Sequence, residues 1–264
     1  MSDLPDFERR FGGVRRLYGE AGLQKLMAAH VVVIGIGGVG SWTAEALARN
    51  AVGQLTLIDL DNIAESNVNR QIHALDGAFG KAKVSAMQAR ILQINPTCQV
   101  HEIEDFITPD NVAQLLDVHA SVIVDCMDDA KAKIALAYYC QQTNTPLIMV
   151  GSAGGKLDPT KIELTDLAHV VGDRLLAKVR NQLRRDHGFP KASNSKKSAK
   201  FNILCVYSDE PVMRPMVSED IACELPDNTS ITGLNCAGYG SSVCVTAPFG
   251  FTAAQCALNL LLKA

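Results

Sequence analysis

HVVVIGIGGVGSWTAEALAR, residues 30–49, is the stretch that decides the fold. Residues 31–34 form a continuous β-branched run, which is typical of a strand buried on both faces of a parallel sheet. A G-x-G-x-x-G pattern follows, and residues 41–49 are typical of a helix. Glycines let a backbone approach phosphate, and a helix start supplies N–H groups, so the order strand–turn–helix predicts a nucleotide site. The glycines predicted to cradle phosphate are Gly35, Gly37, Gly38 and Gly40.

The rest of the chain alternates between strand-like and helix-like segments. Strands are expected over 54–61, 98–103, 121–126, 146–150, 162–164 and 203–207, and helices over 17–30, 82–94, 109–116, 130–144 and 172–185. This alternation predicts an α/β fold, a Rossmann-like, doubly wound, mostly parallel sheet. We expect a single domain over 1–264, with a nucleotide-binding half over 1–155 and a second half over 156–264.

The composition is that of an ordinary globular chain. Of its 264 residues, 47% are hydrophobic and 20% charged, and the net charge is −3. These values exclude a wholly disordered, collagen-like or coiled-coil chain. The start, MSDLPDFERR, has no apolar signal-peptide core, so we expect a cytoplasmic location.

Residues 239–262 carry no charge and are numerous enough to span a bilayer. Pro248 and Gly250 more naturally divide the segment into a short strand, 242–247, and a terminal helix, 252–262. We therefore expect a buried strand–loop–helix extension, and contact with a membrane stays the alternative.

Basic residues concentrate in one part of the second half. Residues 174–200 hold nine basic side chains and one acidic side chain, Asp186. We expect a mobile loop at about 186–200 and a basic patch suited to a polyanion such as nucleic acid. A solvated loop without a partner is the alternative.

Polar residues at the ends of the predicted strands indicate which nucleotide binds. Asp59 ends the second strand, 19 residues after Gly40, where a carboxylate reaches a ribose hydroxyl. A dinucleotide and hydride transfer would need few cations, whereas Arg70 and Lys83 suit a triphosphate with a pyrophosphate leaving group. Asp128 follows the fourth strand, where a carboxylate would hold Mg²⁺. The full predicted nucleotide set adds Asp61, Asn67, Asn69 and Gln71 to these residues and the glycines.

Five motifs together resemble the ubiquitin-activating-enzyme superfamily, whose members adenylylate a carboxylate with MgATP. They are GIGGVG, LIDLD, SNVNRQ, GKAK and DCMD. The resemblance implies that Asn67, Arg70, Gln71 and Lys83 surround ATP and that Asp128 holds Mg²⁺. It also implies a homodimer in which an N-terminal arginine reaches the partner's site. Gly13 stands where that arginine would align, so Arg16 takes the role.

Two features narrow the resemblance to one subfamily. The chain lacks the paired C-x-x-C motifs of most sulfur-carrier adenylyltransferases. It has RFGG, RLYG, NRQIHAL, INP and GSAGGKLDPT, which are similar to the bacterial tRNA threonylcarbamoyladenosine dehydratases. This implies a tRNA substrate whose modified adenosine is adenylylated and cyclised, with release of AMP and pyrophosphate.

Three other functions stay open on the sequence. They are activation of a sulfur-carrier protein's C-terminal carboxylate, a nicotinamide-dependent dehydrogenase and a non-catalytic nucleotide-binding scaffold. Cys236 is a candidate for acyl or persulfide chemistry, as in related activating enzymes, and a structural thiol is the alternative. The same cysteine leaves a cysteine-desulfurase or sulfur-acceptor partner open.

Overall fold

The computed structural model describes residues 6–191, 199–213 and 239–263. Its seven strands form one sheet in the order β3-β2-β1-β4-β5-β7-β6, parallel except where β6 pairs with β7. The strands are β1 (His30–Ile34), β2 (Gln54–Ile58), β3 (Gln99–Ile103), β4 (Val122–Asp125), β5 (Leu147–Val150), β6 (Ile162–Asp166) and β7 (Leu204–Ser208). The predicted α/β fold with a mostly parallel sheet is confirmed.

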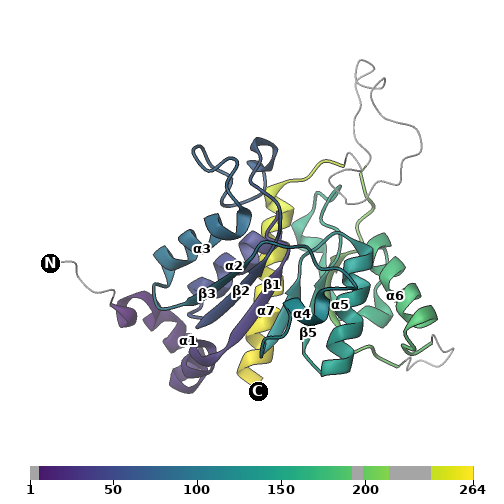
Figure 1. Ribbon diagram of the computed structural model, residues 1–264, viewed down its shortest axis with the longest axis horizontal. Helices are drawn as coiled ribbons and strands as arrows, with labels where there is room; N and C mark the ends of the chain where they lie inside the picture. Colours follow the sequence, from purple (N-terminus) through teal and green to yellow (C-terminus); the bar gives the residue numbers. More distant parts are fainter. Residues whose placement is uncertain (1–5, 192–198, 214–238, 264) are drawn as a thin grey trace, which may run out of the picture.

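Seven α-helices and three short 3₁₀ turns connect these strands within the described ranges (Figure 1). The helices are α1 (Phe7–Ala28), α2 (Gly40–Arg49), α3 (Lys83–Ile94), α4 (Val112–Leu115), α5 (Ala130–Thr143), α6 (Arg174–Asp186) and α7 (Val243–Lys263), and the turns are η1 (Glu65–Asn67), η2 (Pro159–Lys161) and η3 (Leu167–His169). α1 begins well before the expected residue 17, because Asp6 caps it by accepting a hydrogen bond from the Arg9 amide. α4 is shorter than the segment expected at 109–116.

Helices cover both faces of the sheet. Successive side chains of a strand point to opposite faces, and β1 shows the consequence. Val31 and Val33 pack with residues of α2, α3 and α7, whereas Val32 and Ile34 pack with residues of α5 and α6. All of β1 is buried, as its unbroken apolar run predicts. The sheet is therefore doubly wound.

The strand expected at 242–247 is wrong, because this segment is the beginning of α7. The helix continues through Pro248, which cannot donate a hydrogen bond to the carbonyl four residues earlier. That carbonyl belongs to the exposed Cys244, where water can satisfy it. By length and composition α7 could cross a membrane, but 61% of its most apolar window is buried in the fold, as in a core helix.

The chain changes direction in the sheet between β1 and β4. From β1 it proceeds outward to β2 and β3, and β4 then begins the other half of the sheet. Ligands of open α/β sheets bind at such a point, outside the carboxyl ends of the strands. Here the glycine loop makes two close contacts. A Cβ on Gly35, whose φ is +83°, would lie 3.0 Å from the Cys126 carbonyl, and one on Gly40 would lie 1.8 Å from the Gly35 oxygen.

Gly40→Ala should destabilise the protein, because the new methyl group cannot fit between α2 and the Gly35 carbonyl. We expect a loss of about 1–3 kcal/mol in the free energy of unfolding, as for overpacked sites. Gly13→Ala is the control, since its nearest atom is a flexible Arg16 nitrogen at 3.9 Å and the residue lies inside α1. It should raise stability by about 0.5–1 kcal/mol. Urea unfolding of both variants measures the difference, and equal stabilities would contradict the steric argument.

Candidate nucleotide-binding site

A cavity of about 620 Å³ lies at the carboxyl ends of the central strands. Loops after β1, β2, β3, β4 and β5 all contribute to its walls, and the first turn of α7 closes it. Its volume is within the range of small-molecule and cofactor sites. Nine of the predicted site residues line it: Gly35, Gly37, Gly38, Asp59, Asp61, Arg70, Gln71, Lys83 and Asp128.

Asp59 ties the glycine loop to the end of β2. Its Oδ2 accepts a hydrogen bond of 2.6 Å from the Ile36 amide, and its Oδ1 accepts one of 2.9 Å from the Asp61 amide. Burial raises the pKa of this carboxyl group, while Lys83 and the two amides act in the opposite direction. A carboxylate oxygen can accept more than one hydrogen bond. Asp59 can therefore hold the loop and accept from ribose hydroxyls together.

Lys83 places a buried cation in the wall of the cavity. Its Nζ lies 2.7 Å from Asp61 Oδ2 and 3.9 Å from Asp59 Oδ1, and its side chain is 7% exposed. Lys83 is the first residue of α3, so the helix fixes where its side chain begins. An ammonium group has three donors. The two carboxylates thus orient a cation that can still donate to phosphate oxygens.

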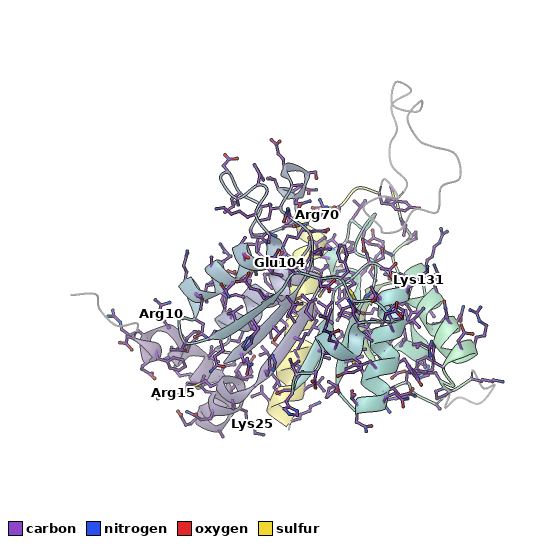
Figure 2. The ribbon with its side chains drawn as sticks, viewed as in Figure 1. Arg10, Arg15, Lys25, Arg70, Glu104 and Lys131 are labelled. Carbon is purple, nitrogen blue, oxygen red and sulfur yellow. The ribbon has the colours of Figure 1, made fainter. Side chains whose placement is uncertain are left out.

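Arg70 lies over the glycine loop, at the end of the molecule where the strands finish (Figure 2). Its Nη1 donates to the Ser66 carbonyl at 2.8 Å and to Asn69 Oδ1 at 2.9 Å. A Cβ on Gly38 would be 3.3 Å from the Arg70 side chain, so the glycine allows the close approach. Burial lowers the pKa of Arg70 from its usual value, but arginine stays charged at neutral pH. Arg70 therefore supplies a second cation.

Gln71 and His73 are buried polar residues on the same loop. Gln71 lines the cavity, and its Oε1 is buried without a hydrogen-bond partner among the described residues, which is a costly arrangement. Both ring nitrogens of His73 also lack a partner within the described ranges. Burial, with Lys83 and Arg90 nearby, lowers the pKa of His73 to about 4, so the ring is neutral at pH 7. His73 does not line the cavity.

The structure places several other predicted residues beside the cavity. Asn67 Oδ1 accepts from the Ala64 amide at 3.0 Å, and Asn69 Nδ2 donates to the Ser241 carbonyl at 2.8 Å. These asparagines shape the loop that carries Arg70, and Gly40 packs against the glycine loop. The cavity walls include none of these three residues.

Arg16 does not line this cavity. Arg16 is exposed on α1, and α1 lies far from Arg70 in Figures 1 and 2. The predicted role of Arg16 in a partner's site stays a prediction. Cys236 lies outside the described residues.

Asp128 lines the cavity as an exposed carboxylate. The neighbouring Asp129 has a structural role, since it caps α5 by accepting from the Ala132 amide at 2.7 Å. Among the described residues there is no group of three His, Cys, Asp or Glu side chains that could hold a metal ion. A metal here would therefore need ligands from a bound molecule as well as Asp128.

Sequence reasoning missed a buried ion pair beneath the cavity. Lys133 Nζ lies 3.0 Å from Asp125 Oδ1 and donates to the Val150 carbonyl at 2.8 Å, and both side chains are fully buried. Asp125 Oδ1 also accepts from the Met127 amide at 3.0 Å. Burial raises the pKa of Asp125, and Lys133 opposes that change. The pair joins the ends of β4 and β5, whose following loops form one wall of the site.

The other contribution that sequence reasoning missed comes from the loop after β3. Asp105, Phe106, Ile107 and Thr108 line the cavity, although no motif marks them. The Phe106 side chain is 50% exposed. An exposed aromatic ring beside a nucleotide-sized cavity can pack against a base, but only the fold brings this loop to the glycine turn.

These features define a nucleotide-binding protein of the Rossmann-like class. They are the doubly wound sheet, the glycine loop where the sheet divides, and the two cations beside that loop. The chain belongs to the ThiF family, whose model matches residues 12–264. It is 46% identical to the tRNA threonylcarbamoyladenosine dehydratase of Escherichia coli (strain K12), over 97% of this chain and 94% of that protein. It is 44% identical to the Haemophilus influenzae protein of the same name, over 100% and 97%.

Crystal structures of the E. coli dehydratase in complex with AMP and with ATP have the same fold. Each aligns with a TM-score of 0.85 at 44% identity, covering 97% of this chain and 95% of the other. The molybdopterin-synthase adenylyltransferase of H. influenzae is 31% identical over 48% of this chain and 52% of that protein. The similarity to the dehydratases therefore covers twice as much of the chain.

Lys133→Met should destabilise the protein by about 3–5 kcal/mol, because it leaves the Asp125 carboxylate buried without its cation. The double variant Asp125→Asn, Lys133→Met removes both charges and should recover much of that loss. Lys131→Met is the control, since Lys131 is exposed on the same helix (Figure 2) and should change stability by less than about 0.5 kcal/mol. Urea denaturation measures all three variants, and similar losses for Lys131 and Lys133 would contradict the role of the pair.

Proposed function

We propose that this chain is an ATP-dependent tRNA threonylcarbamoyladenosine dehydratase. The observation that carries the proposal is the full-length similarity to dehydratases of that name, which includes the part of the chain that lines the nucleotide cavity. Activation of a sulfur-carrier protein is the weaker alternative, because the related adenylyltransferase matches only about half of the chain. Arg70 and Lys83 beside one glycine loop also favour a triphosphate over the dinucleotide of a dehydrogenase.

The proposed reaction has two steps. A carboxylate oxygen of the threonyl group attacks the α-phosphorus of ATP, and the bond to the β-phosphate oxygen breaks. A nucleophile within the same modification then attacks the carbonyl carbon, and AMP leaves with the oxygen that the carboxylate supplied. The products are cyclic threonylcarbamoyladenosine, AMP and pyrophosphate, so ATP removes the elements of water.

The residues of the cavity suit this chemistry. Arg70 and Lys83 can stabilise the charge that develops on pyrophosphate as it leaves. The glycine loop at the start of α2 offers N–H groups to phosphates, and Asp59 can accept from ribose. No side-chain nucleophile is needed for an intramolecular cyclisation, so a structural role for Cys236 is preferred over a covalent one.

A magnesium ion is the proposed cofactor, and Asp128 would hold it. Mg²⁺ is commonly bound through one or two carboxylates together with substrate phosphates and water. Asp128 is an exposed carboxylate in the cavity, which fits this pattern. The ion would neutralise phosphate charge when bound.

We further propose a cytoplasmic homodimer. In it Arg16, which is exposed on α1, would reach the site of the second copy. A cysteine desulfurase or another sulfur-acceptor system is a second proposed partner. These proposals rest on the resemblance stated for the sequence.

For tRNA we propose that α6 provides the phosphate-binding face. Arg174, Lys178 and Arg185 are exposed on this helix, at positions that recur with helical spacing. Arg180 and Arg184 have a different role. Arg180 donates to the Val170 carbonyl, and Arg184 donates to the Pro190 carbonyl at 3.1 Å and lies 5.3 Å from the Phe201 ring centroid. These two arginines anchor the helix.

The basic residues within 174–200 thus have two proposed roles. Some are exposed for binding, and others pack within the fold. Lys191 and Lys200 are exposed as well. Lys196 and Lys197 lie outside the described residues.

Mass spectrometry of nucleosides from tRNA incubated with the protein and MgATP tests the proposed function. We expect conversion of threonylcarbamoyladenosine to its cyclic form. Arg70→Ala, Lys83→Ala and Asp128→Ala should each lower the rate by about 10²–10³, the usual effect of removing one charge-stabilising group. Asp110→Ala is the control, because Asp110 is an exposed carboxylate that does not line the cavity, and it should leave the rate unchanged. Normal rates in all three variants, or AMP formation that depends on a sulfur-carrier protein instead of tRNA, would contradict the proposal.

Lys178→Glu should raise the KM for tRNA and leave ATP affinity unchanged, because α6 lies outside the cavity. Losing one phosphate contact should also reduce the slope of log K against log salt by about 0.7–0.9. Lys161→Glu is the control, an equally exposed lysine in η2, which packs near α7 on the other face of the sheet. Salt titrations of tRNA binding measure both variants. Equal slopes would mean that tRNA contacts another surface.

A further inference from the structure

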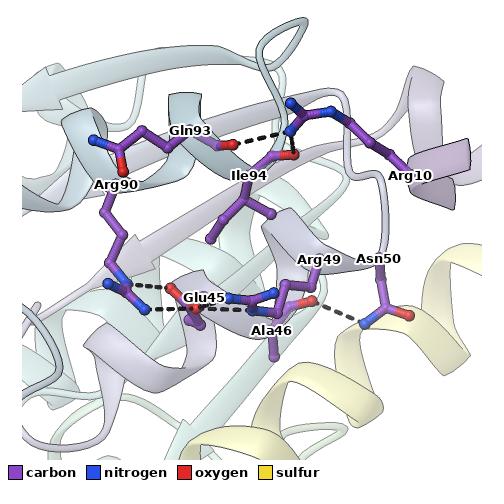
Figure 3. Close-up of polar contacts among 8 residues, drawn as sticks. All are labelled: Arg10, Glu45, Ala46, Arg49, Asn50, Arg90, Gln93 and Ile94. Atoms are coloured by element: carbon purple, nitrogen blue, oxygen red, sulfur yellow. Dashed lines mark hydrogen bonds and ion pairs between the residues drawn. The ribbon is translucent and has the colours of Figure 1, made fainter. Parts of the chain in front are cut away.

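A second cavity, of about 430 Å³, lies among the helices on one face of the sheet (Figure 3). Its walls come from α1, α2 and α3, and the residues that line it are Arg10, Phe11, Arg49, Arg90, Gln93 and Ile94. Half of these are arginines, although the chain as a whole has a net charge of −3. None of the six residues lines the nucleotide cavity. We call this second cavity the arginine pocket.

Two of the arginines are held by one buried carboxylate. Glu45, with a side chain 4% exposed, accepts from Arg90 Nε at 2.6 Å and from Arg90 Nη2 at 3.1 Å. It also accepts a hydrogen bond from Arg49 Nε at 2.8 Å, and Arg49 Nη2 lies 2.7 Å from the same carboxylate. Two guanidinium groups therefore share one negative charge, and their positions are fixed by it.

The third arginine is fixed by a helix end. Arg10 Nη1 donates to the Gln93 carbonyl at 2.9 Å and to the Ile94 carbonyl at 2.8 Å, in the last turn of α3. The end of a helix carries a partial negative charge, and Arg10 compensates it. The exposed carbonyls of α3 consequently do not repel an anion from the pocket. Figure 3 shows Arg10 above the layer formed by Arg49, Glu45 and Arg90.

The group has donors left for a ligand. A guanidinium has five N–H donors, and the hydrogen bonds to Glu45 and to the end of α3 use two on Arg10, two on Arg90 and one on Arg49. Three cations and one carboxylate leave a local excess of positive charge. The Arg49 and Arg90 side chains are 58% and 33% exposed, so a solute can reach them.

We propose that the arginine pocket is a second phosphate-binding site. Planar guanidinium groups bind phosphate through paired hydrogen bonds, and arginines that are already held in place lose little conformational freedom on binding. Lys83 begins α3, and Arg90, the first residue of this helix that lines the pocket, follows it by seven residues, which is about 10 Å of helix rise. The two cavities share no lining residue, so the pocket is a site of its own. The phosphate belongs either to an RNA backbone or to a free polyphosphate.

Calorimetry of inorganic pyrophosphate binding tests the proposal. The nucleotide cavity is first saturated with a non-hydrolysable ATP analogue, so that pyrophosphate can bind only elsewhere. Arg49→Gln should weaken this binding about tenfold, since one charge-assisted donor pair is lost. Glu45→Gln should strengthen it about threefold or more, because it removes the competing negative charge but keeps a side-chain acceptor. Arg15→Gln is the control, an exposed arginine of α1 that pairs with Glu8 outside the pocket. It should bind pyrophosphate as the wild type does.

Binding of unmodified tRNA by the same variants identifies the source of the phosphate. If the RNA backbone occupies the pocket, Arg49→Gln lowers the salt slope by about 0.7–0.9 and pyrophosphate competes with tRNA. If free polyphosphate occupies it, only pyrophosphate binding changes. The proposal would be overturned if all three variants, Arg49→Gln, Glu45→Gln and Arg15→Gln, bound pyrophosphate with one affinity and tRNA with one affinity. Dehydration at saturating tRNA reports on the proposed function separately.

Discussion

The structure depends on how closely α2 approaches the carbonyl of Gly35. A side chain at Gly40 would lie 1.8 Å from that oxygen, so only glycine allows the helix to start there. This contact aims the start of α2 at the crevice between β1 and β4, where the sheet divides. Cys126 closes the crevice from the other side, 3.0 Å from a Cβ on Gly35. The same steric contact therefore sets both the position of the phosphate-binding loop and the packing of α2 where the sheet divides.

Charges at this crevice are arranged in two layers. In the upper layer Asp59 and Asp61 orient Lys83, whose ammonium borders the cavity. In the lower layer Asp125 and Lys133 neutralise each other out of contact with water. Removing one member of a buried pair leaves an uncompensated charge, so the two residues act as a unit that ties the end of β4 to the end of β5. Charge stabilisation of a leaving pyrophosphate requires cations that are already oriented, such as Lys83 in the upper layer.

The sequence was sufficient to predict the parallel sheet, because every central strand is an apolar run between helix-like segments. It also placed Asp59, Arg70 and Lys83 at one site, and all three line the cavity beside the glycine loop, while their roles toward ATP stay predictions. It failed at 242–247, where β-branched residues line a buried helix instead of a strand. It missed Lys133, because Lys131 and Lys133 lie in the same AKAKIALA run and only the packing of α5 decides which is buried. It missed Phe106, because its loop carries no motif and reaches the site through the fold.

The central claim is that this crevice transfers an adenylyl group to a carboxylate. An isotope experiment tests that claim directly. The threonyl carboxylate of the tRNA is labelled with ¹⁸O, and AMP and pyrophosphate are analysed by mass spectrometry after turnover. The account predicts one ¹⁸O in AMP and none in pyrophosphate, because the carboxylate oxygen attacks the α-phosphorus and leaves with AMP. Adenylylation would be contradicted if the cyclised product formed together with unlabelled AMP. It would also be contradicted if the product formed together with ADP and labelled phosphate.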